Sequence, residues 1–185
     1  MTVMWIAVGF FVALAVSLII RSQASFSAQK PSDYDGAATF DVRSTLSGPI
    51  QCEGVIYGPT GRVASRFCAD MEGRWDGNKG TLCEFFTYDS GSTQAREWQL
   101  TVSDDGSIRA EAEDLVGSGQ GWQRGDAVQL NYRIRLMEDA GGHVLDVTDW
   151  MYLTPNGVIM NRSQFRKFGI KVGELVATMR PKEVT

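Results

Sequence analysis

The sequence predicts an all-β domain, an antiparallel up-and-down barrel of about 8–10 strands, preceded by one apolar helix. Three observations lead to this fold class. Short runs of residues alternate between apolar and polar side chains, glycine-rich turns separate one run from the next, and no connection is long enough for a crossover helix. The 20 glycines and five prolines are spread in short groups, as a chain with many tight turns requires.

The N-terminal segment from Val3 to Ile20 has 18 residues without a charge or a proline, close to the ~20 that a helix needs to cross a bilayer. A cleavable signal peptide is the competing interpretation, because the small residues SQAS follow at 22–25. However, no basic residue precedes the apolar run, and the run is longer than the usual apolar region of a signal peptide. The sequence therefore favours a retained transmembrane anchor over residues 1–21.

Three further segments follow the anchor. Residues 22–38 are small and polar with one proline and one glycine, which is typical of a linker that lifts a domain off the membrane. The barrel domain is predicted over residues 39–181, and residues 182–185 form a tail. Phe40–Gly48 at the start of the domain is compatible with one helical turn that ends at Gly48.

The alternation of side chains is clearest from Val128 to Leu136, where every second residue is apolar and the residues between them are Gln, Asn or Arg. Glu97–Val102 and Ser107–Glu113 show the same pattern. One wet face and one buried face are typical of antiparallel strands. The predicted strands cover residues 49–57, 62–75, 80–88, 95–103, 107–116, 120–124, 127–136, 143–154, 158–168 and 170–180.

Each predicted strand follows the previous one through a short turn, so neighbours in sequence are expected to be neighbours in the sheet. Closure into a barrel removes the two unpaired edges that such a meander would otherwise expose. An immunoglobulin-like sandwich is the alternative, but its Greek-key connections do not suit successive hairpins. The sequence therefore favours a barrel with room for packed side chains or one small ligand.

The stretch HVLDVTDWMYLTPNGVIMNRSQF, His143–Phe165, predicts one hairpin in detail. The Pro-Asn-Gly sequence at 155–157 suits a three-residue connection with glycine at the left-handed position. This register pairs Asp149 with Ser163. A two-residue Asn-Gly turn is the alternative; it would set Arg162 diagonal to Asp149 but would put proline where a strand residue normally donates a hydrogen bond.

Asp149 is the unusual residue of this hairpin, because it lies on the more apolar face. In the favoured register that face carries Leu145, Val147, Asp149, Met151, Leu153, Ile159, Asn161 and Ser163. A buried, unpaired carboxylate is unfavourable, so Asp149 must be hydrogen-bonded, ion-paired or protonated. A buried polar network that fixes the strand register is one interpretation, and a polar anchor for a ligand's head group is the second. A catalytic acid or base is the least favoured, because no histidine or second carboxylate is placed beside it by the sequence.

The candidate ligand-binding residues follow from this second interpretation. Asp149 and Asn161 are the expected polar anchors of the ligand. The expected walls of the cavity are Trp98, Tyr132, Trp150 and Met151. No catalytic residue is predicted.

The composition argues against several other classes of function. The 18 basic and 22 acidic side chains give a net charge of −4 and form no basic stripe, so nucleic acid is not an expected partner. A single histidine and the absence of a CxxC pair argue against a metal site, and no cofactor is expected. Cys52, Cys68 and Cys83 are expected to be small buried side chains, with at least one free thiol.

Several longer motifs carry a family resemblance. DVTDWMYL at 146–153 is followed by NRSQFRKFGIKVGEL at 161–175, and GPIQCEGVIYGPTGRVASRF, GRWDGNKGTLCEFFTYDSG and REWQL lie upstream. Their order and spacing resemble a bacterial family of unknown function, domain-of-unknown-function family 3833, over about residues 40–181. The resemblance implies a lipocalin-like barrel without an established activity, and relatives that look like lipoproteins facing the periplasm. This chain has no cysteine after its apolar segment, so a transmembrane helix would replace the lipid anchor.

Taken with the resemblance, the residues predict a membrane-tethered, lipocalin-like barrel that binds a small amphipathic or lipid-like molecule without catalysis. The alternative is a structural or protein-interaction domain of the cell envelope with a filled barrel. The expected partner is the lipid bilayer, through residues 3–20. The resemblance places the barrel on the periplasmic side of a bacterial inner membrane, whereas Arg21 and Lys30 alone would favour the cytoplasmic side.

Overall fold

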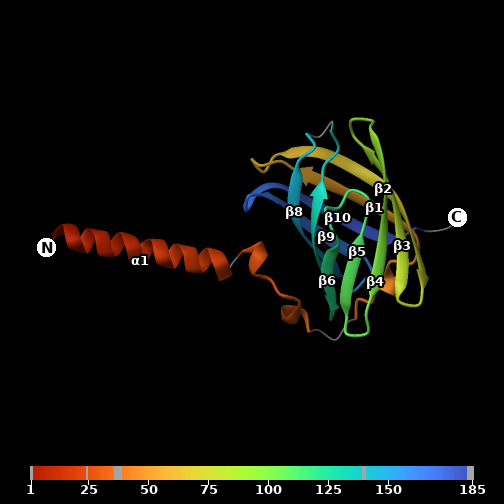
Figure 1. Ribbon diagram of the computed structural model, residues 1–185, viewed down its shortest axis with the longest axis horizontal. Helices are drawn as coiled ribbons and strands as arrows, with labels where there is room; N and C mark the ends of the chain where they lie inside the picture. Colours follow the sequence, from red (N-terminus) through yellow and green to blue (C-terminus); the bar gives the residue numbers. More distant parts are fainter. Residues whose placement is uncertain (1, 24, 36–38, 139–140, 183–185) are drawn as a thin grey trace.

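The computed structural model describes residues 2–23, 25–35, 39–138 and 141–182. In this part of the chain ten antiparallel strands form one closed barrel in sequence order, and β1 closes the barrel against β10 (Figure 1). The strands are β1 (Gly48–Tyr57), β2 (Val63–Asp76), β3 (Lys79–Tyr88), β4 (Thr93–Val102), β5 (Ser107–Glu111), β6 (Gly119–Arg124), β7 (Ala127–Arg135), β8 (Val144–Leu153), β9 (Ile159–Lys167) and β10 (Ile170–Pro181). The predicted up-and-down barrel is confirmed.

The fifth predicted strand is the one that differs most from the structure. It was expected over 107–116, but β5 ends at Glu111. The chain then turns, with the Leu115 amide donating to the Ala112 carbonyl at 3.1 Å, and leaves the regular sheet. Leu115 returns only as an isolated bridge to Ile134 of β7. The residues of this turn continue the alternation of apolar and polar side chains. The alternation alone therefore predicted a longer strand.

The interior of the barrel is built from the apolar side chains at every second position of the strands. Ile50, Val102 and Val128 are among its most buried members. Closure depends on the pairing of β1 with β10, which runs in register from Ile50 opposite Pro181 to Tyr57 opposite Glu174. Because the barrel is closed, the described sheet has no free edge strand.

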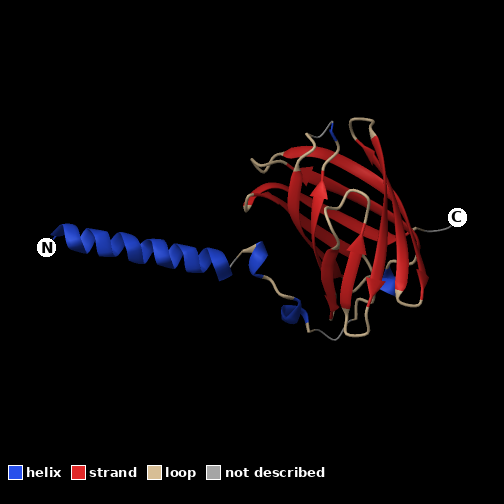
Figure 2. Cartoon of the chain, in the orientation of Figure 1, coloured by secondary structure: helices blue, strands red, loops and turns tan. Residues whose placement is uncertain are grey.

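A short helix, α2 (Val42–Thr45), closes one end of the barrel (Figure 2). The Asp41 carboxylate caps the helix by accepting from the Arg43 amide at 3.0 Å. Leu46, which follows the helix, is buried, and its carbonyl accepts from Nε1 of Trp75 at 2.8 Å. At Gly73 a Cβ atom would lie 1.9 Å from that carbonyl oxygen, so only glycine allows this approach. The helical turn predicted near Phe40–Gly48 is confirmed.

The N-terminal segment forms one helix, α1 (Thr2–Gln23), which extends away from the barrel (Figure 1). Its described apolar side chains, from Met4 to Ile20, are exposed. Within the described residues, no helix meets the combination of length and hydropathy that a membrane-spanning helix needs.

The segment between α1 and the barrel contacts the outer wall of the barrel. It contains two 3₁₀ turns, η1 (Phe26–Ala28) and η2 (Pro31–Tyr34), and we call residues 25–35 the strap. The Tyr152 hydroxyl donates to Oε1 of Gln29 at 2.6 Å, and the Tyr34 ring lies 5.2 Å from the Trp150 ring. Asp35 forms an ion pair with Arg124. The described part of the predicted linker, residues 25–35, is therefore held against the barrel rather than extended from it.

The three cysteines lie in different environments. Cys52 is buried on the inner face of β1, as expected, and burial raises the pKa of its thiol to about 12. Cys68 and Cys83 are exposed, so the prediction that all three are buried was wrong for these two. Both lie at outward positions of their strands, where the period-two alternation places side chains in solvent. All three thiols are free.

Candidate functional site

The hairpin of β8 and β9 has the register that the sequence favours. Asp149 pairs with Ser163, and Trp150 pairs with Arg162. The connection is closed by the Thr154 amide, which donates to the Val158 carbonyl at 2.9 Å, and residue 157 is a glycine with φ of +81°. The alternative register, with Arg162 diagonal to Asp149 on one face, does not occur.

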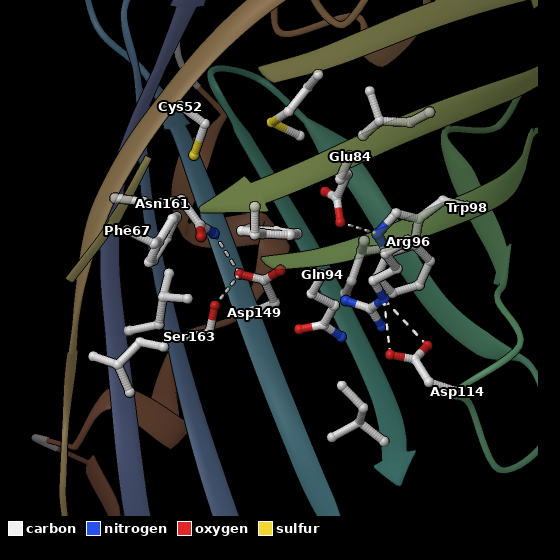
Figure 3. Close-up of a pocket in the computed structure, with 18 of the residues that line it drawn as sticks. Cys52, Phe67, Glu84, Gln94, Arg96, Trp98, Asp114, Asp149, Asn161 and Ser163 are labelled. Carbon is white, nitrogen blue, oxygen red and sulfur yellow. Dashed lines mark hydrogen bonds and ion pairs between the residues drawn. The ribbon is translucent and has the colours of Figure 1, made fainter. Parts of the chain in front are cut away.

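The Asp149 carboxylate points into the barrel, where two side chains of β9 bind it. The Ser163 hydroxyl donates to Oδ1 of Asp149 at 2.8 Å, and Nδ2 of Asn161 donates to the same oxygen at 2.5 Å (Figure 3). Nδ2 of Asn161 also bonds the Trp150 carbonyl at 3.1 Å. Burial raises the pKa of Asp149, and the two donors offset part of that rise. The carboxyl group is thus hydrogen-bonded, which is one of the three expected solutions, and its pKa lies above the ordinary aspartate value.

This arrangement separates two substitutions of Asp149. Asparagine retains an oxygen that accepts from Ser163 and Asn161, so Asp149→Asn is expected to change the free energy of unfolding by less than about 1 kcal/mol. Alanine leaves the Ser163 hydroxyl without its acceptor and removes one of the two acceptors of Asn161 Nδ2, so Asp149→Ala is expected to lower it by about 1–3 kcal/mol. Urea unfolding of the full chain measures both changes. Equal losses in the two variants would contradict the hydrogen-bonding role.

A second polar cluster faces the same interior and was not predicted from the sequence. Nε of Arg96 on β4 lies 3.0 Å from Oδ2 of Asp114, which follows β5 (Figure 3). The Arg96 guanidinium also lies 4.0 Å from the centroid of the Trp98 ring. Nε1 of Trp98 in turn donates to Oε2 of Glu84 on β3 at 3.3 Å. The cluster therefore joins one cation, two carboxyl groups and an aromatic ring.

The sequence held a signal for part of this cluster. Glu84 lies two residues from Leu82 and from Phe86, so the alternation of β3 places it on the inner face, as for Asp149. Arg96 likewise lies two residues before Trp98 on the inner face of β4. Asp114 lies outside the regular strands, and no periodic pattern predicts its direction.

Burial changes the pKa values of the ionisable groups in this cavity. It raises the pKa of Glu84 to about 7, and Arg96 and the Trp98 hydrogen bond offset only part of that rise. Burial also raises the pKa of the Tyr132 hydroxyl, and Asp149 adds to the effect. Glu84 therefore acts as a hydrogen-bond donor below about pH 7, and the raised pKa of Asp149 favours the same role, whereas an ionised carboxylate only accepts.

Both clusters line one cavity of about 440 Å³ inside the barrel. Its lining is mostly apolar and extends from Val42 in α2 and Leu46 just after it to Ser92 and Met137 at the other end of the barrel. Of the predicted site residues, the structure brings five to this cavity: Trp98, Tyr132, Asp149, Met151 and Asn161.

Trp150 is the exception among the predicted walls. It is fully buried, yet it lies on the outer face of β8, where the Tyr34 ring covers it. Its outward direction follows from the register, but its burial depends on the strap. The prediction that Trp150 lines the cavity was wrong, because a large apolar side chain was assumed to face the interior.

A closed ten-stranded barrel with an internal cavity belongs to the class of small up-and-down β-barrel proteins. Within that class, the chain belongs to the family described as protein of unknown function (DUF3833), which matches residues 20–181. This confirms the family resemblance of the motifs.

A solved structure shows the same fold. It is a protein of unknown function from the DUF3598 family of Nostoc punctiforme PCC 73102, 10% identical in sequence, with a TM-score of 0.53. The similarity covers 78% of this chain and 50% of that one, so this chain spans about half the length of the Nostoc protein. No curated protein matches the chain.

Proposed function

We propose that the barrel binds a small amphipathic, lipid-like molecule in its cavity, without catalysis. The observation that carries this proposal is the cavity of about 440 Å³ with a mostly apolar lining and two polar clusters. Ligand sites in proteins commonly occupy about 300–1,000 Å³ and combine an apolar lining with a few placed polar groups. The open volume supports ligand binding over the alternative of a filled barrel that serves only as a structural or interaction domain.

The polar groups suit a head group that accepts hydrogen bonds. Nη2 of Arg96 is buried and has no hydrogen-bond partner among the described residues. Glu84 and Asp149, when protonated, each offer one more donor. An oxygen-bearing head group, such as a carboxyl or hydroxyl, can replace the water that these donors would otherwise need. The apolar lining then covers an acyl or other hydrocarbon tail.

Trp98 provides a direct test, because it belongs to the second cluster and lines the cavity. A dibrominated fatty acid quenches a tryptophan that it touches. Added to the full chain in nanodiscs, it is expected to quench fluorescence with saturation, and unbrominated oleate is expected to reverse the effect. Trp98→Phe should remove the saturable part of the quenching.

Trp122→Phe is the matched control, because Trp122 is 46% exposed on the outer wall and does not line the cavity. It should retain the saturable quenching. Quenching that does not saturate, or that is equal in both variants, would show that the fatty acid enters only the lipid and would refute cavity binding.

We further propose that α1 binds a lipid bilayer and tethers the barrel to it. The exposed apolar side chains of α1 from Met4 to Ile20 support this, because uncovered apolar area of this extent is unfavourable in water. We place the membrane as a bacterial inner membrane with the barrel on its periplasmic side, as the family resemblance implies. Protease digestion of intact spheroplasts should then cleave the barrel.

A further inference from the structure

The tip of the β9–β10 hairpin exposes two large apolar side chains. Phe168 is 90% exposed and Ile170 is 69% exposed. Lys167 pairs with Ile170, so Phe168 and Gly169 form the two-residue connection between the strands. No other large apolar side chain in the described part of the barrel is as exposed as these two. Because they are exposed, these two side chains bury little apolar area and contribute little to the stability of the fold.

The backbone at the tip is also unfavourable for phenylalanine. Phe168 has φ of +53° and Gly169 has φ of +77°, the pattern of the hairpin turn that prefers Asn-Gly. Among the described residues, Phe168 is the only residue other than glycine with a positive φ. A bulky side chain is disfavoured in this conformation. Neither burial nor backbone preference explains Phe168, which indicates a contact outside the chain.

Basic side chains surround the tip. Lys167 lies 5.9 Å from the centroid of the Phe168 ring, and Lys171 follows Ile170 by one residue. Lys171 also bonds Glu174 at 2.7 Å but remains 44% exposed. Apolar side chains flanked by lysines match the interface of a bilayer, where the rings enter the acyl boundary and the ammonium groups meet anionic head groups.

The strap contacts the strand that leads to this hairpin. The Phe26 ring, in η1, lies 4.9 Å from the guanidinium of Arg162, which is on β9 itself. The strap, which follows α1 in the chain, is therefore held on the wall of the barrel that includes β9. Figure 1 shows the β9–β10 hairpin, in blue, reaching to the side from which α1 leaves the barrel.

We propose that the tip of the β9–β10 hairpin is a second membrane-contact site, in which Phe168 and Ile170 enter the interfacial region of an anionic bilayer and Lys167 and Lys171 face its head groups. The site rests on the tether proposed for α1. Together, two contacts fix the orientation of the barrel on the bilayer, whereas α1 alone would leave it free to rotate about the helix axis.

Spin labels at three positions test the site and the tether separately. The full chain, with Cys68→Ser and Cys83→Ser to remove the exposed thiols, is labelled at one introduced cysteine at a time in nanodiscs that contain phosphatidylglycerol. Ile170→Cys reports the hairpin, Val12→Cys reports α1, and Phe85→Cys is the control. Phe85 is 51% exposed on β3. Figure 1 shows β3 on the side of the barrel away from α1.

The hairpin label should be accessible to oxygen and shielded from a polar nickel reagent, whereas the Phe85→Cys label should show the opposite. A hairpin label as accessible to nickel as the control would overturn the proposal, whatever the helix label shows. A helix label in water with a shielded hairpin label would refute the tether alone. Equal shielding in phosphatidylcholine discs would overturn the role of the two lysines.

Phe168→Asn separates membrane contact from folding. Asparagine tolerates the positive φ better than phenylalanine, so the variant should have a higher urea midpoint than the parent chain. In the Ile170→Cys background the same change should expose the spin label to the nickel reagent. A label that stays shielded after this change would show that Phe168 does not hold the hairpin in the membrane.

Discussion

Replacing Arg96 by methionine is expected to lower the free energy of unfolding by about 3–5 kcal/mol. The side chain of Arg96 is 13% exposed and that of its partner Asp114 is 23% exposed, so neither charge is well solvated. Methionine fills a similar volume but leaves Asp114 without its cation, and it removes the positive charge that offsets the burial of Glu84. Breaking a buried ion pair from one side costs far more than the pair contributes as a whole. Urea unfolding of the full chain, followed by tryptophan fluorescence, measures the loss.

Arg109→Met provides the matched control for this prediction. Arg109 also pairs with a carboxylate, Glu111, at 2.7 Å, but the two side chains are 62% and 53% exposed. Breaking such a surface pair is expected to change the free energy of unfolding by less than about 1 kcal/mol. A similar small change for Arg96→Met would show that solvent reaches the Arg96–Asp114 pair, and the interior electrostatics described for the cavity would then be wrong.

Strands and register were predictable from the sequence because their signals are local. Side chains alternate with a period of two, and in the β8–β9 hairpin a Pro-Asn-Gly connection fixes which residues are opposite. Asp149 therefore faces Ser163, as predicted. Barrel closure followed from the short turns. When each strand pairs with its neighbours in sequence, only one edge of β1 and one edge of β10 remain unpaired, and these two edges pair with each other.

The position of the strap was not predictable, because its contacts connect residues far apart in the chain. Gln29 and Tyr152, which share a hydrogen bond, are 123 residues apart. Nothing in the pattern of either segment specifies that partner. Without the strap, the outer face of β8 would be exposed to solvent. Trp150 was therefore expected to line the cavity, although it lies on that outer face under Tyr34.

The second polar cluster was missed for a different reason. Glu84 and Arg96 occupy inner positions that alternation does predict, but they lie on different strands, and the pattern of one strand does not specify its contacts with another. Only the contact of Arg96 with Asp114 and the bond from Trp98 to Glu84 show that these charges form a cluster. Such contacts join separate segments of the chain, and no single strand pattern contains them.

The two polar clusters raise the question of why charged side chains lie inside a mostly apolar barrel. A buried ion pair is often no more stabilising than apolar side chains of the same volume. Here Arg96, Asp114, Glu84 and Asp149 all line one cavity rather than a filled core. Stability alone does not call for this set, which supports the interpretation of Asp149 and its neighbours as ligand anchors.

The stability of the protein is expected to fall as the pH rises from about 4.5 through about 7, because of Glu84. The folded chain keeps a proton on Glu84 up to about pH 7, whereas the unfolded chain releases it near the ordinary glutamate pKa of 4.5. Between these values the folded state binds more protons than the unfolded state, so the free energy of unfolding decreases with pH. Above pH 7 the loss reaches about 3 kcal/mol. The raised pKa of Asp149 acts in the same direction.

Glu84→Gln isolates the contribution of this residue. Glutamine resembles the protonated acid, so the variant should match the parent chain at pH 4.5 and be more stable by up to about 3 kcal/mol at pH 8. Urea unfolding at both pH values measures the difference. Glu111→Gln is the control, because Arg109 lowers the pKa of Glu111 and its replacement should bring no gain at pH 8. A Glu84→Gln variant that is no more stable than the parent at pH 8 would contradict this prediction. It would mean that Glu84 ionises in the folded barrel at little cost in free energy, as it would in a solvent-filled cavity without a fixed polar cluster.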